Sequence, residues 1–216
     1  NVISKFISEP DTGICSAWNK GIKYAKGDWL LFFGDNDQFY NKNVLYLMSK
    51  QLNLLSKNIL IAYGKITVVN ETSTIATYGK NWELSEKEFY SIMNLPHQGV
   101  FHRKELFKKI GLFNEKYKFA GEYDLCLKSI THCEPYFIPR TICKMMYGGQ
   151  SSQASFSWRV LNEFRKIRVN NGYRGYTLIW IWHFIKSIIK YLISKLVGNE
   201  ITYNLIYKFK KILKKY

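Results

Sequence analysis

Two carboxylates stand two positions apart in the segment Gly34-Asp35-Asn36-Asp37. Oxygen ligands of this kind suit Mg²⁺ or Mn²⁺, and such a cation in turn bridges the phosphate oxygens of a substrate. By itself the segment is also explained by an Asx-type turn, because Asp-x-Asp is common in polar turns. The metal site is therefore a hypothesis that the neighbouring residues have to support.

The elements around the acidic segment predict an α/β fold. The apolar run 29–33 directly before it is typical of a buried strand in a parallel sheet, and open α/β sheets bind ligands at the carboxyl ends of such strands. Before this strand, the pattern predicts a short strand over 1–8 and a helix over 14–26. After it, we expect helices over 42–56, 103–110, 122–131, 156–170, 176–197 and 202–215, and strands over 59–70, 72–78 and 136–142.

Composition and charge limit the possible classes of protein. The chain has 216 residues, 47% of them hydrophobic and 17% aromatic, which excludes wholesale disorder and suits one domain with an appendage. The net charge is +16, but residues 1–150 carry 19 Lys and Arg against 14 Asp and Glu, whereas residues 151–216 carry 13 against 2. The basic last third is expected to meet an anionic partner, such as a membrane surface, a nucleic acid or a phosphorylated lipid.

The cysteines and the start of the chain bear on its compartment and completeness. Cys15, Cys126, Cys133 and Cys143 form no CxxC pair and no His/Cys ligand spacing, so we predict reduced thiols in a cytoplasmic protein. The first residues carry no signal-peptide pattern. Because the sequence opens at Asn1 inside an apparent strand, we expect a fragment that lacks its N-terminal portion.

Four blocks of sequence, in this order, resemble the family 2 glycosyltransferases of the GT-A fold, and most of all the bacterial branch that builds O-antigen, capsule and exopolysaccharide. The blocks are residues 8–22, the strand ending in 34–37, residues 96–103, and residues 111–124 followed by 148–152. The resemblance covers residues 3–155. It implies a GT-A (Rossmann-like) mixed sheet flanked by helices over residues 1–155, N-terminally truncated, followed by a basic, amphipathic helical region over 156–216.

The resemblance also implies roles for the acidic segment. Asp37, with Asp35, is expected to hold Mn²⁺ or Mg²⁺ against the diphosphate of a nucleotide-sugar donor. Asp11, Asn19 and Asn36 match positions near the nucleotide, although Asn19 is equally plausible as a structural hydrogen-bonding residue. In the family, an N-terminal βαβ region supplies most contacts to the nucleotide base, and we expect this chain to begin after that region.

A second acidic group, Glu122-Tyr123-Asp124, opens the helix predicted over 122–131. The resemblance implies that Glu122 stands where relatives have the Asp that acts as general base. Asp124 is the alternative candidate for this role. A sugar hydroxyl needs a positioned carboxylate to take its proton as it attacks the anomeric carbon. On the residues alone, both acids are explained as favourable charges at a helix N-terminus.

Five further residues are candidates for contacts to the sugar, the diphosphate or the acceptor. His97 and Gln98 are expected to face the sugar or the diphosphate, although a hydrogen-bonded loop histidine is the simpler explanation. Arg103 is predicted either to contact phosphate or to be a solvated residue early in its helix. Gln150 and Ser151 belong to a Gly-rich segment that resembles the loop closing over the donor, with a plain surface turn as the alternative.

The segment 176–197 combines a short apolar stretch with Trp180, Trp182 and Tyr191 and with recurring lysines. The apolar stretch before Lys186 is too short to span a bilayer, and lysines recur at 186, 190 and 195, which is typical of a helix lying in the interface of an anionic membrane. The alternative is a helix pair packed on the catalytic domain or on a second subunit. Five lysines near the C-terminus add a polybasic end, at positions 208, 210, 211, 214 and 215.

Together these features predict an inverting, metal-dependent glycosyltransferase at the inner face of the plasma membrane, acting on a saccharide or polyprenyl-linked acceptor in cell-surface polysaccharide synthesis. Two alternatives are a nucleotidyltransferase on a similar sheet and a non-catalytic basic module of the membrane surface. Nucleic acid is disfavoured as a partner, because the aromatic residues sit in apolar runs and are not interleaved with basic residues.

Overall fold

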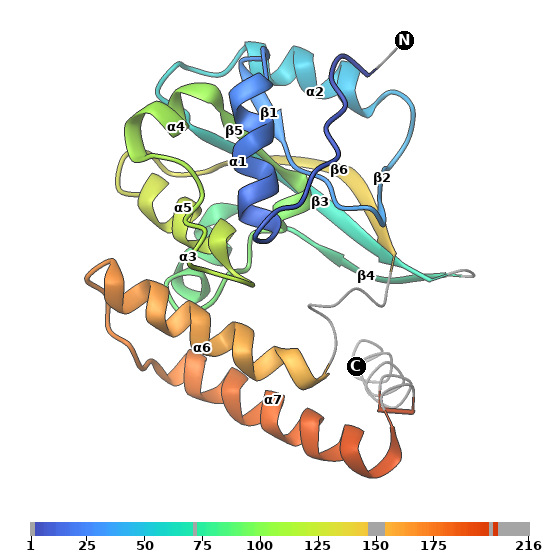
Figure 1. The fold of residues 1–216 in the computed structure, drawn as a ribbon, viewed down its shortest axis with the longest axis vertical. Helices are drawn as coiled ribbons and strands as arrows, with labels where there is room; N and C mark the ends of the chain where they lie inside the picture. Colours follow the sequence, from blue (N-terminus) through green and yellow to red (C-terminus); the bar gives the residue numbers. More distant parts are fainter. Residues whose placement is uncertain (1–2, 71–72, 147–153, 199–200, 203–216) are drawn as a thin grey trace.

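A computed structural model describes residues 3–70, 73–146, 154–198 and 201–202. Helices flank a mixed sheet, and a hairpin of two long helices lies beneath it (Figure 1). The helices are α1 (Ile14–Tyr24), α2 (Val44–Asn53), α3 (Trp82–Phe89), α4 (Lys104–Ile110), α5 (Gly121–Ser129), α6 (Ala154–Asn170) and α7 (Leu178–Val197), with a 3-10 turn η1 at His97–Gly99. The strands are β1 (Trp29–Leu31), β2 (Asp37–Phe39), β3 (Ile61–Val69), β4 (Thr74–Tyr78), β5 (Val100–Arg103) and β6 (Tyr136–Met146).

The sheet has the strand order β1-β5-β3-β6-β2, and β4 pairs with β3 beyond the end of β5. Strands β3 and β6 are parallel, and the other pairs are antiparallel. The run 29–33 was expected in a parallel sheet, but β1 pairs with its neighbour β5 in antiparallel register, Leu30 opposite His102. The long strands β3 and β6 pair along most of their length, and β2, which begins at Asp37, pairs with β6.

Helices α6 and α7 pack as a hairpin against the face of the domain that carries α3 and α5. Leu161, Phe164 and Ile167 of α6 are buried in the same core as α5, and the Trp180 indole of α7 donates to the Leu161 carbonyl at 2.7 Å. The boundary expected between 155 and 156 thus falls inside the first turn of α6, a helix that completes the core.

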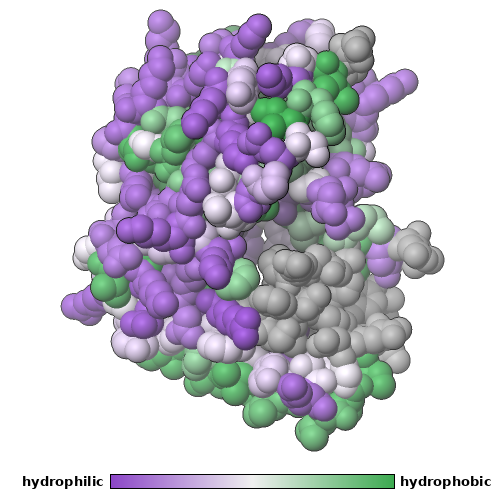
Figure 2. All heavy atoms as spheres, viewed as in Figure 1, coloured by the Kyte–Doolittle hydropathy of each residue, from purple (hydrophilic) through white to green (hydrophobic). Residues whose placement is uncertain are grey.

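The opposite face of α7 is apolar and exposed, and it is visible along the lower edge of Figure 2, where α7 lies in Figure 1. Because a helix turns about 100° per residue, the exposed side chains share one face, away from buried Trp180 and Ser187. Within the described residues, no helix is long and apolar enough to cross a membrane. The exposed residues of this α7 apolar face are Leu178, Ile181, Trp182, Ile185, Ile189, Leu192 and Leu196.

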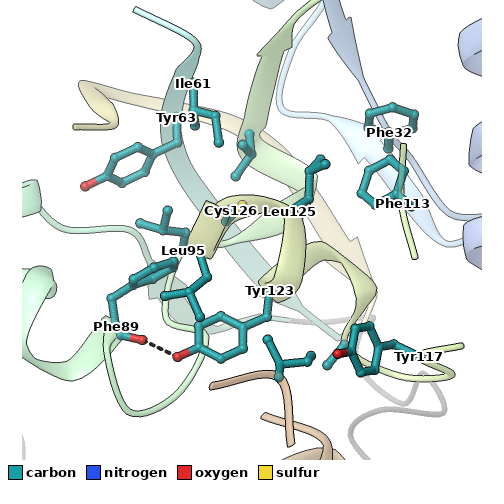
Figure 3. Packing of buried hydrophobic residues seen from close by; sticks show 14 of the residues in the cluster. Phe32, Ile61, Tyr63, Phe89, Leu95, Phe113, Tyr117, Tyr123, Leu125 and Cys126 are labelled. Atoms are coloured by element: carbon teal, nitrogen blue, oxygen red, sulfur yellow. Dashed lines mark hydrogen bonds between the residues drawn. The ribbon is translucent and has the colours of Figure 1, made fainter. Parts of the chain in front are cut away.

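Two cores cover the two faces of the sheet, because successive residues of a strand point to opposite sides. On one face, Ala62 and its neighbours pack against Val44, Met48 and Leu52 of α2. The larger core on the other face joins α1, α3, α4, α5 and α6, and Figure 3 shows its centre. There the Tyr123 hydroxyl of α5 donates to the Phe89 carbonyl at the end of α3 at 2.7 Å. Helix α5 is therefore fixed by packing and by a buried hydrogen bond.

Most predicted elements are confirmed within a few residues, and three differences matter. Residues 3–8 form no strand, and the side chains of Ile3 and Phe6 are exposed. Strand β2, which begins at Asp37, was not predicted, and it pairs with β6, which was expected over 136–142 but extends to Met146. Helix α3 was not predicted, since its sequence is mostly polar and only Trp82, Ser85 and Phe89 are buried. The helix predicted over 202–215 lies almost wholly outside the described residues.

Candidate active site

The acidic turn is closed by its own hydrogen bonds. The backbone N–H of Gly34 donates to Oδ2 of Asp37 at 2.7 Å, and the N–H of Asp37 donates to the Gly34 carbonyl at 3.3 Å. Asp35 and Asn36 are exposed, whereas Asp37 is partly buried. Burial raises the pKa of the Asp37 carboxyl and the Asp35 charge adds to this, while the Gly34 hydrogen bond opposes it. The turn thus presents two neighbouring carboxylates whose repulsion a cation would relieve.

Strand β6 and the turn η1 hold the acidic turn from the other side. Asp37 lies opposite Met145 in the β2–β6 register, and the Met146 N–H donates to the Asn36 carbonyl at 3.2 Å. The Gln98 amide lies 3.3 Å from the Met145 sulfur. The structure therefore brings Gln98 close to the acidic turn. Gln150 and Ser151 follow β6 in the chain, and the loop predicted for them lies outside the described residues.

The chemistry of this turn fits a hard divalent cation shared with a substrate. Asp35 and Asp37 supply oxygen ligands only, the type that Mg²⁺ and Mn²⁺ take. Among residues 3–70, 73–146, 154–198 and 201–202, no three His, Cys, Asp or Glu residues are grouped as a closed metal site. Two carboxylates leave coordination positions for water and phosphate oxygens, which is how Mg²⁺ is commonly held.

Glu122 stands in the first turn of α5, partly buried near the start of α1. Burial raises the pKa of its carboxyl to about 7, and the charge of Glu163 adds to the shift, while its own backbone N–H opposes it. The nearby thiol of Cys15 also feels this carboxylate, since burial and then Glu122 raise the Cys15 pKa to about 12. A carboxylate with a pKa near 7 is suited to general base catalysis at neutral pH.

Asp124, the alternative base, is occupied by structural contacts. It is 2% exposed, and its Oδ2 accepts from the Lys128 ammonium at 2.6 Å. Its Oδ1 accepts from the Asn171 amide at 2.9 Å. With both oxygens paired, Asp124 ties α5 to the end of α6, and Glu122 is left as the better candidate for the base.

Glu163 is a residue that the sequence did not single out. Its carboxylate accepts the backbone N–H groups of three consecutive residues directly before α5, at 2.9 Å from Lys118, 2.7 Å from Phe119 and 2.7 Å from Ala120. It stands more than forty positions away in sequence, in a basic helix with no motif around it, so no local signal identifies it. Only the packing of α6 brings it to this loop.

His97 lies in an aromatic cluster and not in an open loop. Its ring is 4.6 Å from the Trp18 ring and 5.5 Å from that of His102, and it is 9% exposed. Within the described residues, neither ring nitrogen of His97 has a hydrogen-bond partner. Burial, and then His102, lower the His97 pKa well below its usual range. A buried ring without a hydrogen-bond partner is not the hydrogen-bonded loop histidine that was the alternative, and the expected contact of His97 with the sugar or the diphosphate stays a prediction.

Arg103 is bound to the scaffold. Its guanidinium donates to the carbonyls of Ile59 (2.8 Å) and Ser56 (3.1 Å) and lies 4.4 Å from the ring centre of Trp29. Trp29 begins β1, whereas the acidic turn follows the end of that strand. We therefore assign Arg103 to the loop after α2 and not to the diphosphate, and neither of its two predicted environments describes it.

The residues predicted on the nucleotide side divide into two kinds. The Asn19 amide is buried, where it exchanges two hydrogen bonds with the backbone of Phe113 (2.9 and 3.0 Å) and donates to Glu115. It is thus the structural residue that was the alternative. Asp11 accepts from the Gly13 N–H at 2.9 Å at the start of α1 and lines an open cavity of about 350 Å³ together with Lys20.

Comparisons with known proteins show the family to which the sequence is similar. The sequence matches the family described as Glycosyl transferase family 2 over residues 3–119, just over half of the chain. It is 28% identical over 124 residues to a PGL/p-HBAD biosynthesis glycosyltransferase of Mycobacterium bovis, covering 57% of this chain and 46% of that protein. It is 26% identical over 176 residues to a hyaluronan synthase of Pasteurella multocida, covering 80% of this chain. The chain spans 46% of the first relative and 18% of the second.

The fold is similar to that of a mannosyltransferase from Pyrobaculum calidifontis, solved in complex with GDP-Man and Mn²⁺. The TM-score is 0.53 at 12% sequence identity, and the match covers 94% of this chain and 60% of the mannosyltransferase chain. At this identity the likeness concerns the fold. It confirms the expected GT-A, Rossmann-like α/β fold with a mixed sheet flanked by helices.

Proposed function

The chain belongs to glycosyl transferase family 2, and we propose that it is an inverting, metal-dependent glycosyltransferase that moves a sugar from a nucleotide-sugar donor to an acceptor hydroxyl. One observation carries the proposal. The candidate residues form two acidic parts with different environments: Asp35 and Asp37 are neighbouring carboxylates in one turn, whereas Glu122 is a single carboxylate whose pKa burial raises to about 7. The first part suits a cation, and the second suits proton transfer.

The acidic turn would hold the leaving group. Asp37, with Asp35, would bind Mn²⁺ or Mg²⁺, and a cation bound there neutralises the charge that develops on the departing nucleoside diphosphate. The hydrogen bond from the Gly34 N–H to Oδ2 of Asp37 fixes the orientation of the carboxylate, and with it the direction of its other oxygen. Gln98, which lies at Met145 beside the turn, is in place to orient the donor.

Glu122 would act on the acceptor. As the acceptor oxygen attacks the anomeric carbon, the carboxylate takes its proton, and the diphosphate leaves from the opposite face of the sugar with inversion. A hydroxyl is a poor nucleophile at neutral pH, so a base with a pKa near 7 is more effective than an ordinary glutamate. In the proposed role, this chain belongs to cell-surface polysaccharide synthesis of the O-antigen, capsule or exopolysaccharide type.

We propose further that the α7 apolar face docks on the anionic inner leaflet of the plasma membrane, where a polyprenyl-linked acceptor would be presented. Its exposed apolar side chains are bordered by aromatic–lysine pairs, with Lys186 5.3 Å from the Trp182 ring centre and Lys195 5.7 Å from that of Tyr191. Apolar residues that enter the acyl boundary beside lysines at headgroup level are the profile of an interfacial helix.

The activity is tested by nucleoside diphosphate release from a panel of UDP-, GDP- and dTDP-sugars with Mn²⁺ or Mg²⁺. We expect release with one donor, its loss without metal or in Asp37→Ala, and a larger effect of Glu122→Ala on transfer than on donor binding. Asp28→Ala, which removes an exposed carboxylate near the start of β1, is the matched control. Release that is equal in Asp37→Ala and wild type would contradict the proposed metal site.

The membrane surface is tested by co-sedimentation with vesicles of neutral phosphatidylcholine and vesicles that also contain anionic phosphatidylglycerol. We expect binding to the anionic vesicles, lost when Ile189 and Leu192 are replaced together by Ser. Leu84→Ser is the control, because Leu84 is also exposed but lies on α3. No vesicle binding, with a dimer in light scattering that the same double variant abolishes, would instead identify this face as an interface between two copies.

A further inference from the structure

Helix α6 contacts the segment just before the candidate base, Glu122, through one carboxylate, that of Glu163. Glu163 accepts three consecutive backbone N–H groups, Lys118 on Oε1 and both Phe119 and Ala120 on Oε2. All three N–H groups belong to the last residues before α5, whose second residue is Glu122. Hydrogen bonds to an ionised acceptor are about twice as strong as neutral ones, so this carboxylate restrains the path of the chain into α5.

Other contacts from α6 act on the same stretch. The Asn170 amide donates to the Tyr117 hydroxyl at 2.9 Å, and the Phe164 ring packs at 5.0 Å from the Tyr123 ring. These contacts bracket residues 118–120 and the first turn of α5. A helix that lies outside the region matched by the family description therefore supports the backbone on both sides of Glu122.

We propose that Glu163 is a positioning residue for Glu122, because its carboxylate fixes the backbone of residues 118–120 and so sets where the base side chain begins. The proposal rests on the proposed function, in which Glu122 is the general base. It assigns α6 to the catalytic unit. The role is distinct from catalysis, since Glu163 is not expected to touch the donor or the acceptor.

The charge of Glu163 gives this role a measurable signature. The groups that face Glu122 are the Glu163 carboxylate from α6, the Cys15 thiol from α1 and the Cys126 thiol from α5. Burial raises the pKa of both thiols, so both are neutral at the pH of the reaction. Glu163 is thus the charged neighbour among the described residues, and its charge adds to the rise that burial produces in the pKa of Glu122.

The test uses the whole chain, its Glu163→Gln variant, and Glu105→Gln as a control that removes one exposed carboxylate from α4. Two measurements need no substrate: amide hydrogen exchange at residues 118–120, and the pH titration of the Glu122 carboxyl carbon by ¹³C NMR, assigned with Glu122→Gln. In Glu163→Gln we expect exchange at 118–120 to be about tenfold faster or more. We also expect Glu122 to titrate at lower pH than in wild type.

A third measurement is the transfer reaction, where we expect a lower kcat in Glu163→Gln with an unchanged KM for the donor. Unchanged exchange at 118–120 would overturn the proposal. Faster exchange with the Glu122 titration and kcat of wild type would also overturn it, by leaving Glu163 a purely structural role. If Glu163→Gln does not fold, Glu163→Asp is used in its place. It keeps the charge, so Glu122 should titrate as in wild type, whereas its shorter side chain should make amide exchange at residues 118–120 faster. A wild-type chain without transfer activity would refute the proposed function. Amide exchange and the Glu122 titration need no substrate, so they would still test whether Glu163 positions Glu122.

Discussion

The first residue of α5, Gly121, lies directly against the Cys15 thiol in the first turn of α1, so closely that a Cβ atom at Gly121 would overlap the sulfur. Cys15 is 3% exposed and its Sγ also contacts the Tyr117 carbonyl. Two helix N-termini thus meet at one point, one from the helix that follows Asp11 and one from the helix that carries Glu122. The proposed donor and acceptor sides of the site are joined there by the close packing of Gly121 on Cys15 and by the contact of the Cys15 thiol with the Tyr117 carbonyl.

This contact predicts that Gly121→Ala destabilises the fold by about 1–3 kcal/mol, because the added methyl group has no space beside the Cys15 sulfur. Removing the sulfur should restore stability, so the double variant with Cys15→Ala is expected to recover most of the loss. Urea unfolding measures both. Gly21→Ala is the control, because an added Cβ there meets nothing within 4 Å. A Gly121→Ala variant as stable as wild type would contradict this account of the contact.

The acidic turn predicts a metal-dependent stabilisation that needs Asp37. Addition of Mn²⁺ together with UDP or GDP should raise the melting temperature by about 5 °C when the correct nucleotide is present, since only the folded state binds it. Asp37→Asn keeps an oxygen for the Gly34 N–H but loses the charge, so the fold should survive while the Mn²⁺ shift disappears. The same shift in Asp37→Asn and wild type would exclude Asp37 as a ligand.

The raised pKa of Glu122 predicts that an increase in pH has opposite effects on the transfer rate and on the stability of the fold. Its carboxyl must be ionised to act as base, so the transfer rate should rise with pH through about 7 and level off above it. Its folded-state pKa is raised above that of the unfolded chain. The stability that it contributes is therefore complete below the unfolded value of about 4.5 and is lost as the pH rises through 7.

Glu122→Gln should consequently lower transfer by about 10²- to 10⁴-fold and stabilise the fold at pH 8 by about 2–3 kcal/mol. Urea unfolding at pH 5 and pH 8 and the pH–rate profile together check this. At pH 5 the variant and the wild type should differ little in stability. A Gln variant that is less stable than wild type at pH 8, or one that retains full transfer, would contradict the assignment.

The buried histidines predict a loss of stability in acid. Burial lowers the pKa of His102 from 6.5 to about 4, and the backbone of Leu30 and Val100 opposes the shift only in part. A lowered histidine pKa means that the unfolded chain binds the proton first, so stability is lost as the pH falls from about 6.5 towards 4. His102 alone should account for about 2 kcal/mol between pH 7.5 and 5.

His102→Leu isolates this effect, which is necessary because Glu122 acts in the opposite direction over part of the same range. The difference in unfolding free energy between His102→Leu and wild type should change by about 2 kcal/mol from pH 7.5 to 5, in favour of the variant. A difference that is constant with pH would mean that His102 takes up its proton as readily in the folded chain as in the unfolded one.

Much of the architecture was predictable from local pattern. The apolar runs that became β1 and β3, the helical periodicity of α1 and α7, and the glycine after α4 all act within a few residues of one another. Gly111, for example, ends α4 with φ of 87°, a conformation that favours glycine. The acidic turn and the first turn of α5 were predictable for the same reason, since each is a compact motif at the end of an element.

The remaining features depend on contacts between distant segments. The sequence does not show that Glu163 reaches residues 118–120, that Asn19 serves Phe113, or that both oxygens of Asp124 are used. A polar side chain satisfies its hydrogen bonds with whatever the tertiary fold brings near it. The roles predicted for Arg103 and Asn19 came from their position in the sequence. In the fold, both side chains instead form hydrogen bonds with backbone groups of distant segments.

The turn between α6 and α7 depends on a buried cation, and this yields a last prediction. Arg168 has no exposed surface, and its guanidinium donates to the carbonyls of Gly175 and Tyr90 and to the Thr177 hydroxyl. Replacement by Met keeps the aliphatic stem but removes the donor to the Gly175 and Tyr90 carbonyls, whereas the Thr177 hydroxyl still accepts from the Trp180 N–H. The variant no longer buries a charge, which is favourable, but we expect the lost hydrogen bonds to the buried carbonyls to outweigh this and to leave a net loss of about 2–3 kcal/mol.

Urea unfolding of Arg168→Met measures this loss, with Arg165→Met as the control, because Arg165 is only partly buried and its guanidinium carbon lies 5.0 Å from the Tyr176 ring centre. The control should lose less than about 1 kcal/mol. Because α6 packs on α5, Arg168→Met should also speed amide exchange at residues 118–120, where Glu163 binds. If Arg168→Met is clearly destabilised but residues 118–120 exchange as in wild type, the α6–α7 turn and residues 118–120 open independently.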